Sequence, residues 1–236
     1  MNEENLSFIR ELVSDGTIRG PVLELGAGYG GLTSRPAIPP AMGYRSTDIA
    51  GAVDYVANFE SRAGFEAIAE RFRAILILNV LEHTFEPIRV LDNALSLLVP
   101  GGAIVTSTPV IWPIHNYPID CCRLLPDFYI RYAETRGLDL VPERFAYLGF
   151  GPIAGYRAPD GLFRLPKHSK AKGMAGSVTR GGYRLFRALA RGGLAIYPYV
   201  AIVAVFRDRG EQAPGPAARA PAATVSQGVV EMRRST

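Results

Sequence analysis

A glycine-rich turn directly after a short apolar run is the first feature of this sequence that could bind a small molecule. The run Pro21–Leu25 is typical of a buried strand, and Gly26, Ala27 and Gly28 follow it. Glycines let the backbone turn tightly and let a ligand approach the main chain. Asp48 lies 22 residues after Gly26 at the end of a second predicted strand, where a carboxylate can accept hydrogen bonds from both hydroxyls of a ribose. We therefore expect a nucleoside-type ligand at the carboxyl ends of these strands.

The same glycines, extended to Gly31, also fit the dinucleotide-binding pattern G-x-G-x-x-G. Two features near the turn oppose that interpretation, and the motifs later in the chain fit it less well. Glu24 precedes the first glycine by two residues, where its carboxylate would repel a diphosphate but could engage a cationic group. Three prolines, Pro36, Pro39 and Pro40, shorten the following helix, whose N-terminus a diphosphate would need. An NAD(P)-dependent oxidoreductase remains an alternative, as does a non-catalytic ligand-binding protein.

Two histidines follow later predicted strands and are candidates for acid–base chemistry. His83 follows the strand Ala74–Leu81, and His115 follows the strand Ala103–Ser107. Imidazole is the usual base near neutral pH, so either side chain could accept a proton from an acceptor group. In the alternative interpretation His83 lies at the start of a helix and only fixes the loop.

The residues around His115 could line the site of an acceptor molecule. The candidates for this role are Trp112, Tyr117, Asp120 and Arg123. Asp120 and Arg123 could equally form an internal ion pair that shapes the loop, and Trp112 could equally be a core residue. We expect the neighbouring Glu82 to accept structural hydrogen bonds. The sequence shows no metal-ligand spacing around the adjacent thiols Cys121 and Cys122, so no metal is expected.

Strands that alternate with helices must position these side chains. Fully apolar strands in such an alternation indicate a parallel α/β sheet. An N-terminal helix is expected from Leu6, Ile9, Leu12 and Val13 at helical spacing. The other predicted strands are Arg45–Ile49, Asp54–Ala57 and Tyr199–Phe206, and the other predicted helices are Glu66–Arg71, Pro87–Leu98, Asp127–Thr135 and Ser177–Arg191.

Two further motifs complete a pattern that resembles a known family. They are Asn79-Val80-Leu81-Glu82-His83 and Pro100-Gly101-Gly102. Together with the glycine turn they resemble the class I S-adenosylmethionine (SAM)-dependent methyltransferases, especially the bacterial branch with a Leu-Glu-His motif after strand four. The stretch His115–Pro126 is similar to a subgroup with an H-x-x-P-x-D-x-x-R-x-x-P pattern. The resemblance spans roughly residues 21–148.

The resemblance implies a Rossmann-like, seven-stranded, mostly parallel sheet with helices on both faces and an antiparallel last strand. It also implies SAM as cofactor and a small-molecule, sugar or lipid-linked acceptor, with O-methylation favoured. Asn58 stands where relatives commonly have an acid, although an amide can still pair with the adenine. The family's contacts correspond to Glu24, Gly26, Ala27 and Gly28 for the methionine part, Asp48 and Ile49 for the ribose, Asn58 and Phe59 for the adenine, and Asn79 and Val80 beneath the sulfonium.

The charge is divided unevenly along the chain. Residues 1–156 hold 12 basic and 18 acidic residues, whereas residues 157–209 hold 11 basic and 2 acidic residues. We expect one catalytic domain over residues 1–209, with 157–198 as a basic insertion or lid and 210–236 as a disordered tail. The basic segment 157–209 could contact an anionic membrane surface, and no nucleic-acid-binding module is visible. The N-terminus lacks the apolar run of a signal peptide, so a cytoplasmic location is expected.

Overall fold

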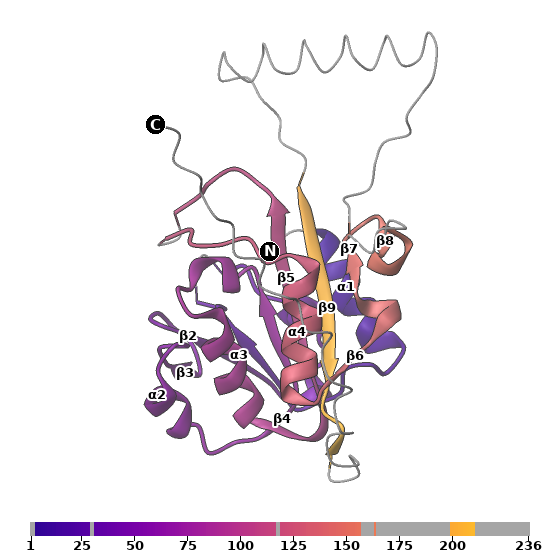
Figure 1. The fold of residues 1–236 in the computed structure, drawn as a ribbon. Helices are drawn as coiled ribbons and strands as arrows, with labels where there is room; N and C mark the ends of the chain where they lie inside the picture. The colour runs from indigo at the N-terminus through magenta and orange to yellow at the C-terminus, as the bar shows by residue number, and fades with distance from the viewer. Residues whose placement is uncertain (1–2, 29–30, 117–118, 157–162, 164–198, 211–236) are drawn as a thin grey trace, which may run out of the picture.

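The computed structural model describes residues 3–28, 31–116, 119–156, 163 and 199–210. Figure 1 shows their arrangement around one central sheet. The helices are α1 (Glu3–Ser14), α2 (Arg62–Glu66), α3 (Pro87–Ser96) and α4 (Pro126–Arg136), and short 3-10 helices include η1 (Arg35–Ala37), η2 (Pro40–Met42) and η3 (Leu81–His83). The strands are β1 (Val22–Leu25), β2 (Tyr44–Asp48), β3 (Tyr55–Val56), β4 (Phe72–Leu78), β5 (Leu98–Ile111), β6 (Asp139–Leu140), β7 (Ala146–Tyr147), β8 (Gly151–Pro152) and β9 (Val200–Arg207).

The strands follow the order β3-β2-β1-β4-β5-β9-β7-β8, and β6 pairs with β9 outside this path. Pairing is parallel from β3 through β5. Beyond β5 it becomes antiparallel, because β9 runs against β5, β6 and β7. The carboxyl ends of the parallel strands therefore meet at one edge of the sheet, which is where ligands bind in open α/β sheets.

The mixed α/β fold and the antiparallel direction of β9 agree with the sequence-based prediction, but the predicted count of seven strands is wrong. The sheet has nine strands in the described part of the chain. The excess comes from the chain after α4, where β6, β7 and β8 are two residues long each. Segments this short are too brief to show an alternating pattern in a sequence.

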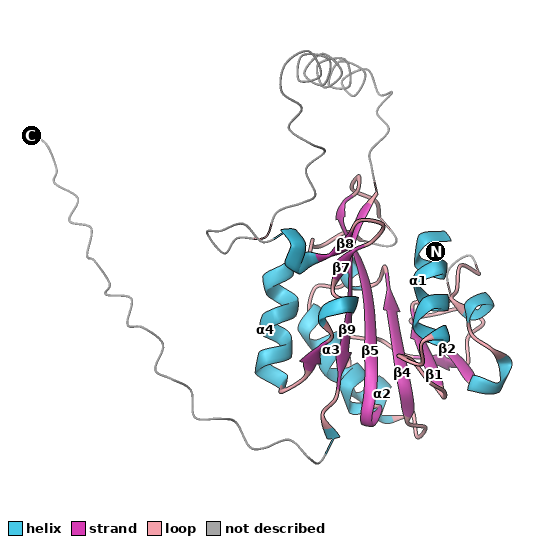
Figure 2. Cartoon of the chain, turned by 90° about the vertical axis from the view of Figure 1, so that its right-hand side faces the viewer, coloured by secondary structure: helices cyan, strands magenta, loops and turns pink. Residues whose placement is uncertain are grey.

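Helices cover both faces of the sheet, as Figures 1 and 2 show. On one face, α1 packs Phe8, Ile9 and Leu12 against a buried cluster that includes Val22 and Leu76. On the opposite face, α3 and α4 pack against a second cluster built on the alternate residues of the same strands. Because successive residues of a strand point to opposite faces, strands buried on both sides must be apolar throughout.

Two predicted helices differ from the structure or lie outside it. The helix expected at Glu66–Arg71 is wrong, since α2 spans Arg62–Glu66 and places Phe65 in the core. The residues after α2 are needed to reach β4, which begins at Phe72. The helix expected at Ser177–Arg191 lies outside the described residues, as do most of the basic segment and residues 211–236. No helix in the described ranges is long and apolar enough to cross a membrane.

Candidate functional site

The glycine turn after β1 lies at the carboxyl edge of the sheet, between the end of β2 and the segment that follows β4. The backbone N–H groups of Gly26 and Ala27 both donate to the carbonyl of Thr47, at 2.9 and 3.2 Å. Gly26 has a φ of 77°, a conformation that side-chain-bearing residues rarely adopt. A Cβ on Gly26 would lie 2.4 Å from Cγ2 of Val80, so the turn passes directly against a residue two positions after the end of β4. The turn thereby joins the ends of β1, β2 and β4.

Asp48, the last residue of β2, holds the same turn with its carboxylate. Its Oδ2 accepts the N–H of Gly28 at 2.8 Å, and its Oδ1 accepts the N–H of Ile49 at 2.6 Å. A Cβ on Gly28 would lie 2.7 Å from the carbonyl oxygen of Ala50 and 2.8 Å from Cβ of Asp48. Gly28 is therefore required by contacts within the chain. The carboxylate of Asp48 stays half-buried at the strand end, with lone pairs remaining for hydroxyl donors.

Glu24, by contrast, is engaged inside the protein. Its side chain is buried, and its carboxylate accepts the N–H of Ser34 at 3.0 and 2.9 Å. The hydroxyls of Ser34 and Tyr44 donate to the same carboxylate at 2.6 and 2.5 Å. Burial raises the pKa of Glu24 above its ordinary value, although these hydrogen bonds oppose the rise. In this arrangement Glu24 anchors the segment that follows the turn, and its direct contact with a ligand remains a prediction.

The residues expected around a nucleoside divide into exposed and buried ones. Asn58 is exposed and uses its Oδ1 to accept the N–H of Glu60 at 2.9 Å. Ile49 is 54% exposed at the end of β2. Phe59 is buried and packs edge-on against Phe65, so it belongs to the core beneath this surface. The structure thus leaves Ile49 and Asn58 accessible and buries Phe59, and the contacts of these residues with a nucleoside remain a prediction.

Asn79 lies in a strained position at the end of β4. Its φ is 57°, the only positive value among non-glycine residues in the described ranges, and such outliers concentrate at functional sites. Its amide accepts a hydrogen bond from Asn5 of α1 at 2.9 Å and donates one to the hydroxyl of Tyr199 at 3.0 Å. Ser107 of β5 donates to Asn5 at 2.8 Å and completes the network. The sequence analysis missed Asn5 and Tyr199, although a buried Asn on the apolar face of α1 was a usable signal.

Next to Asn79, the structure brings Glu82, His83 and His115 together. The rings of His83 and His115 meet edge to face with centroids 4.8 Å apart, although 32 positions separate them in the sequence. Nε2 of His83 lies 3.8 Å from Oε1 of Glu82. Burial lowers the pKa of His83, so the neutral imidazole is favoured. The two residues predicted to be catalytic therefore share one location.

Glu82 is the least satisfied polar group of this cluster. It is fully buried, and neither carboxylate oxygen makes a hydrogen bond of normal geometry among the described residues, although the side chain of Asn79 and the backbone of Glu82 lie close enough to lower its pKa. The expectation that Glu82 accepts structural hydrogen bonds stays a prediction. Burial raises its pKa to about 7. An ionised carboxylate in such a place carries a large desolvation penalty unless a cation compensates it.

Among the residues expected to contact an acceptor, two form an ion pair. Both terminal nitrogens of Arg123 donate to the carboxylate of Asp120, NH2 at 2.7 Å to Oδ2. Hydrogen bonding to Arg123 holds the pKa of Asp120 well below its usual range. The side chain of Asp120 is 2% exposed, and it also accepts the N–H of His115 at 3.0 Å. The internal ion pair is thus observed, and Asp120 faces the loop that carries His115.

Of the two aromatic candidates on the same loop, the structure describes only Trp112. Trp112 is 41% exposed and meets the ring of Tyr199 edge to face at 5.4 Å, so it is not a core residue. Its role as a wall for an acceptor remains a prediction. Tyr117 lies outside the described residues.

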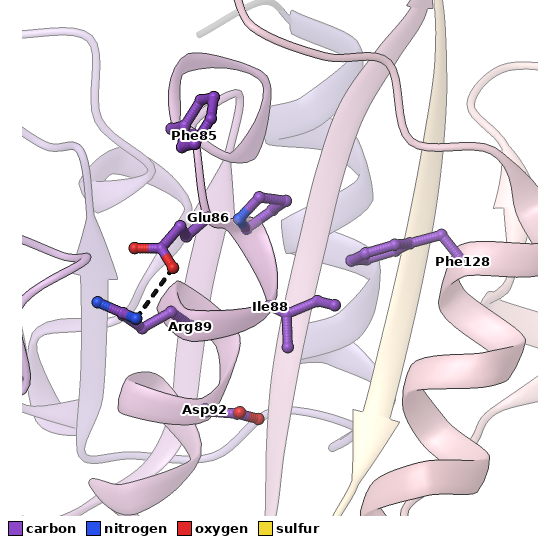
Figure 3. Close-up of a pocket in the computed structure, with 7 residues that line it drawn as sticks. Phe85, Glu86, Ile88, Arg89, Asp92 and Phe128 are labelled. Atoms are coloured by element: carbon purple, nitrogen blue, oxygen red, sulfur yellow. Dashed lines mark ion pairs between the residues drawn. The ribbon is translucent and has the colours of Figure 1, made fainter.

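A groove of about 410 Å³ opens between α3 and α4. Figure 3 shows Phe85, Ile88 and Phe128 on its walls and the ion pair between Glu86 and Arg89 at its side. None of the site residues predicted from the sequence lines this groove. The functional candidates gather instead at the loops that follow β1, β2, β4 and β5.

The fit of Gly26 against Val80 predicts a measurable loss of stability. Gly26→Ala should lower the free energy of unfolding by about 2–5 kcal/mol, because the new Cβ adds left-handed backbone strain and overlaps Cγ2 of Val80. Gly31→Ala is the matched control, since Gly31 has a φ of 67° with open space around its Cβ position. It should cost only the backbone strain, about 1–2 kcal/mol. Equal losses in urea unfolding would show that Val80 does not restrict the turn.

Comparisons with known proteins give weak matches. No protein-family model matches the chain, and no curated protein matches it either. Among solved structures, similar ones include a SAM-dependent methyltransferase from Archaeoglobus fulgidus (15% identity, TM-score 0.47, 88% of this chain and 95% of that chain covered). Others are the magnesium protoporphyrin IX methyltransferase of Synechocystis with bound SAM (12%, 0.46, 86% and 76%) and an N-methyltransferase from Bradyrhizobium japonicum in complex with S-adenosyl-L-homocysteine (13%, 0.44, 87% and 86%). Similarities this low do not assign the chain to a family.

Proposed function

We propose that this protein is a SAM-dependent methyltransferase that acts on a small-molecule, sugar or lipid-linked acceptor, with transfer to a hydroxyl oxygen. The observation that carries the proposal is the pairing of the glycine turn after β1 with the carboxylate of Asp48 after β2. A turn held by that carboxylate at the carboxyl edge of a parallel sheet is a place for a nucleoside with a ribose and a compact charged tail.

The residues at this edge suit SAM better than a dinucleotide. The segment after the turn contains only the 3-10 helices η1 and η2 within residues 31–43, so it offers no long helix N-terminus for a diphosphate. The sixth position of the sheet is taken by the antiparallel strand β9, whereas dinucleotide-binding sheets of the 3-2-1-4-5-6 order are parallel there. Asp48 would bind the ribose hydroxyls, and the backbone of Gly26–Gly28 would hold the methionine end.

Bound SAM supplies a methyl group on a positively charged sulfur, which makes the sulfur a ready leaving group. The protein must then place an acceptor oxygen in line with that methyl and take up the proton that the hydroxyl loses. Positioning of this kind can lower the barrier by roughly 7–11 kcal/mol. His83 donates from Nδ1 to the carbonyl of Ile119 at 2.5 Å, which leaves the lone pair on Nε2. The cluster of Glu82, His83 and His115 is accordingly the proposed place for handling the acceptor proton.

A ligand-binding experiment separates this function from its rivals. SAM and S-adenosyl-L-homocysteine should bind by calorimetry and raise the thermal midpoint, because a ligand at 100 times its Kd stabilises the folded state by about 2.7 kcal/mol. NAD⁺ and NADP⁺ should give no shift. A shift with NAD⁺ alone would favour an oxidoreductase. Binding of SAM without methyl transfer to any offered sugar, lipid or extract component would favour a non-catalytic binding protein.

A further inference from the structure

We infer that Glu82, His83 and His115 form a binding site for one divalent transition-metal ion. One donor atom from each residue lies within 4.8 Å of the other two. The three side chains come from η3 and from the loop after β5, so the fold assembles the site from two separate segments. No short ligand motif in the sequence reveals it.

The buried carboxylate of Glu82 is the first observation that points to a ligand. Neither of its oxygens makes a hydrogen bond of normal geometry in the described part of the chain, although the side chain is 1% exposed. Buried carboxylates in proteins are normally hydrogen-bonded, paired or bound to a metal. Nε2 of His83 lies 3.8 Å from one of these oxygens, so the carboxylate faces an imidazole nitrogen.

The hydrogen bonds around both imidazoles are the second observation. Nδ1 of His83 bonds to the carbonyl of Ile119 at 2.5 Å. Nδ1 of His115 lies 3.1 Å from the carbonyl oxygen of Pro113 and 3.3 Å from Oδ2 of Asp120. All three partners are acceptors, so each Nδ1 carries the proton and each Nε2 carries the lone pair. Metal-binding histidines are oriented in this way by backbone carbonyls and carboxylates.

The Asp120–Arg123 ion pair extends this arrangement outward. Arg123 holds the carboxylate of Asp120, and Asp120 accepts the backbone N–H of His115. The position of the His115 ring is therefore set by its own backbone, by Pro113 and by the ion pair. This supporting role explains why a nearly buried ion pair lies beside the two histidines.

The donor set selects the class of ion. One carboxylate oxygen and two imidazole nitrogens suit Zn²⁺, Fe²⁺ or Mn²⁺, whereas Mg²⁺ and Ca²⁺ prefer all-oxygen sites. With bonds of about 2.1 Å in a tetrahedral site, donor atoms lie about 3.4 Å apart around an ion. The side chains must therefore close by up to about 1.4 Å from their present upper limit of 4.8 Å. Three protein ligands leave further coordination positions for water or an acceptor oxygen.

The role of such an ion rests on the proposed function, but the site itself does not. In a methyltransferase, an ion here would bind the acceptor hydroxyl and lower the pKa of that hydroxyl. Cation binding can be measured on the protein alone, with neither SAM nor an acceptor present. A failure of the metal site is therefore distinguishable from a failure of the methyltransferase assignment.

The test begins with the full-length protein after treatment with a chelator and dialysis. Calorimetric titration with Zn²⁺ should show one site, with weaker binding of Mn²⁺ and no heat from Mg²⁺ under the same conditions. The chain has 3 histidines, so their imidazole NMR signals can be followed in the unaltered protein. Zn²⁺ should shift the signals of His83 and His115 and leave that of His168 in place. Unshifted signals of His83 and His115 at saturating Zn²⁺ would overturn the proposal.

Matched variants locate the ligands. Glu82→Gln and His115→Gln should each weaken Zn²⁺ binding roughly tenfold or more. His168→Gln and Glu86→Gln are the controls for loose binding by a histidine and by a carboxylate, and both should bind as the wild type does. Circular dichroism checks that each variant is folded. If a variant does not fold, the NMR titration of the unaltered protein still tests the proposal. Wild-type affinity in Glu82→Gln and His115→Gln, or loss of binding only when Cys121 and Cys122 are changed to Ser, would contradict the proposal.

Discussion

His115→Gln is expected to lower the turnover number of methyl transfer roughly 10²–10⁴-fold while leaving the affinity for SAM nearly unchanged. His115 lies on the loop after β5, and its ring contacts His83 rather than the glycine turn. A group that acts only on the acceptor during the reaction should affect kcat more than cofactor binding. His83→Gln should have the same effect, because both imidazoles belong to one cluster. Steady-state kinetics together with SAM calorimetry would measure both quantities.

His168→Gln is the matched control for this prediction, and its turnover should equal that of the wild type. Chelator treatment separates two ways in which the cluster could act. If the histidines hold an ion, chelation should lower wild-type turnover to the level of the variants, and Zn²⁺ or Mn²⁺ should restore it. If one histidine acts as a base without a metal, chelation should have no effect. Wild-type turnover in both His83→Gln and His115→Gln would remove the cluster from catalysis altogether.

The long elements of this fold were predictable because their burial pattern is strong. Continuous apolar residues from Ala74 to Leu78 in β4 and the helical spacing of Leu91 and Ala94 in α3 follow directly from burial. The prolines after the glycine turn correctly indicated that no long helix forms between residues 31 and 43. The short strands β6–β8 could not be predicted, since they depend on pairing with β9 and with one another.

The candidate site was predictable where a residue type reflects a backbone requirement. Gly26 is such a case, because its left-handed conformation and its contact with Val80 both demand glycine. The contact between the rings of His83 and His115 could not be predicted, since it depends on how the loop after β5 folds back toward η3. Backbone N–H groups of Cys121 and Cys122 donate to the carbonyl of Glu82 at 2.7 and 3.3 Å, and these contacts bring the loop to its place. Nothing in the local sequence specifies such long-range hydrogen bonds.

The second large effect is expected at Asp48. Asp48→Ala should weaken SAM binding about 10- to 150-fold, because losing a hydrogen bond to a charged group costs about 1.5–3 kcal/mol. The carboxylate also holds the N–H groups of Gly28 and Ile49, so the variant loses both ribose contacts and the support of the turn. Calorimetric titration with SAM measures the affinity, and urea unfolding measures how much of the change comes from stability.

Asp54→Ala is a close control, because Asp54 also caps the backbone of β2. Its Oδ2 accepts the N–H and the hydroxyl of Ser46, both at 2.8 Å, but Asp54 is exposed, and the N–H of Gly28 in the glycine turn donates to Asp48 instead. The two variants should therefore lose similar stability, while only Asp48→Ala loses affinity for SAM. Comparable losses of affinity in both variants would mean that β2 is needed only as a structural support. Unchanged affinity in Asp48→Ala would show that the carboxylate binds no ribose.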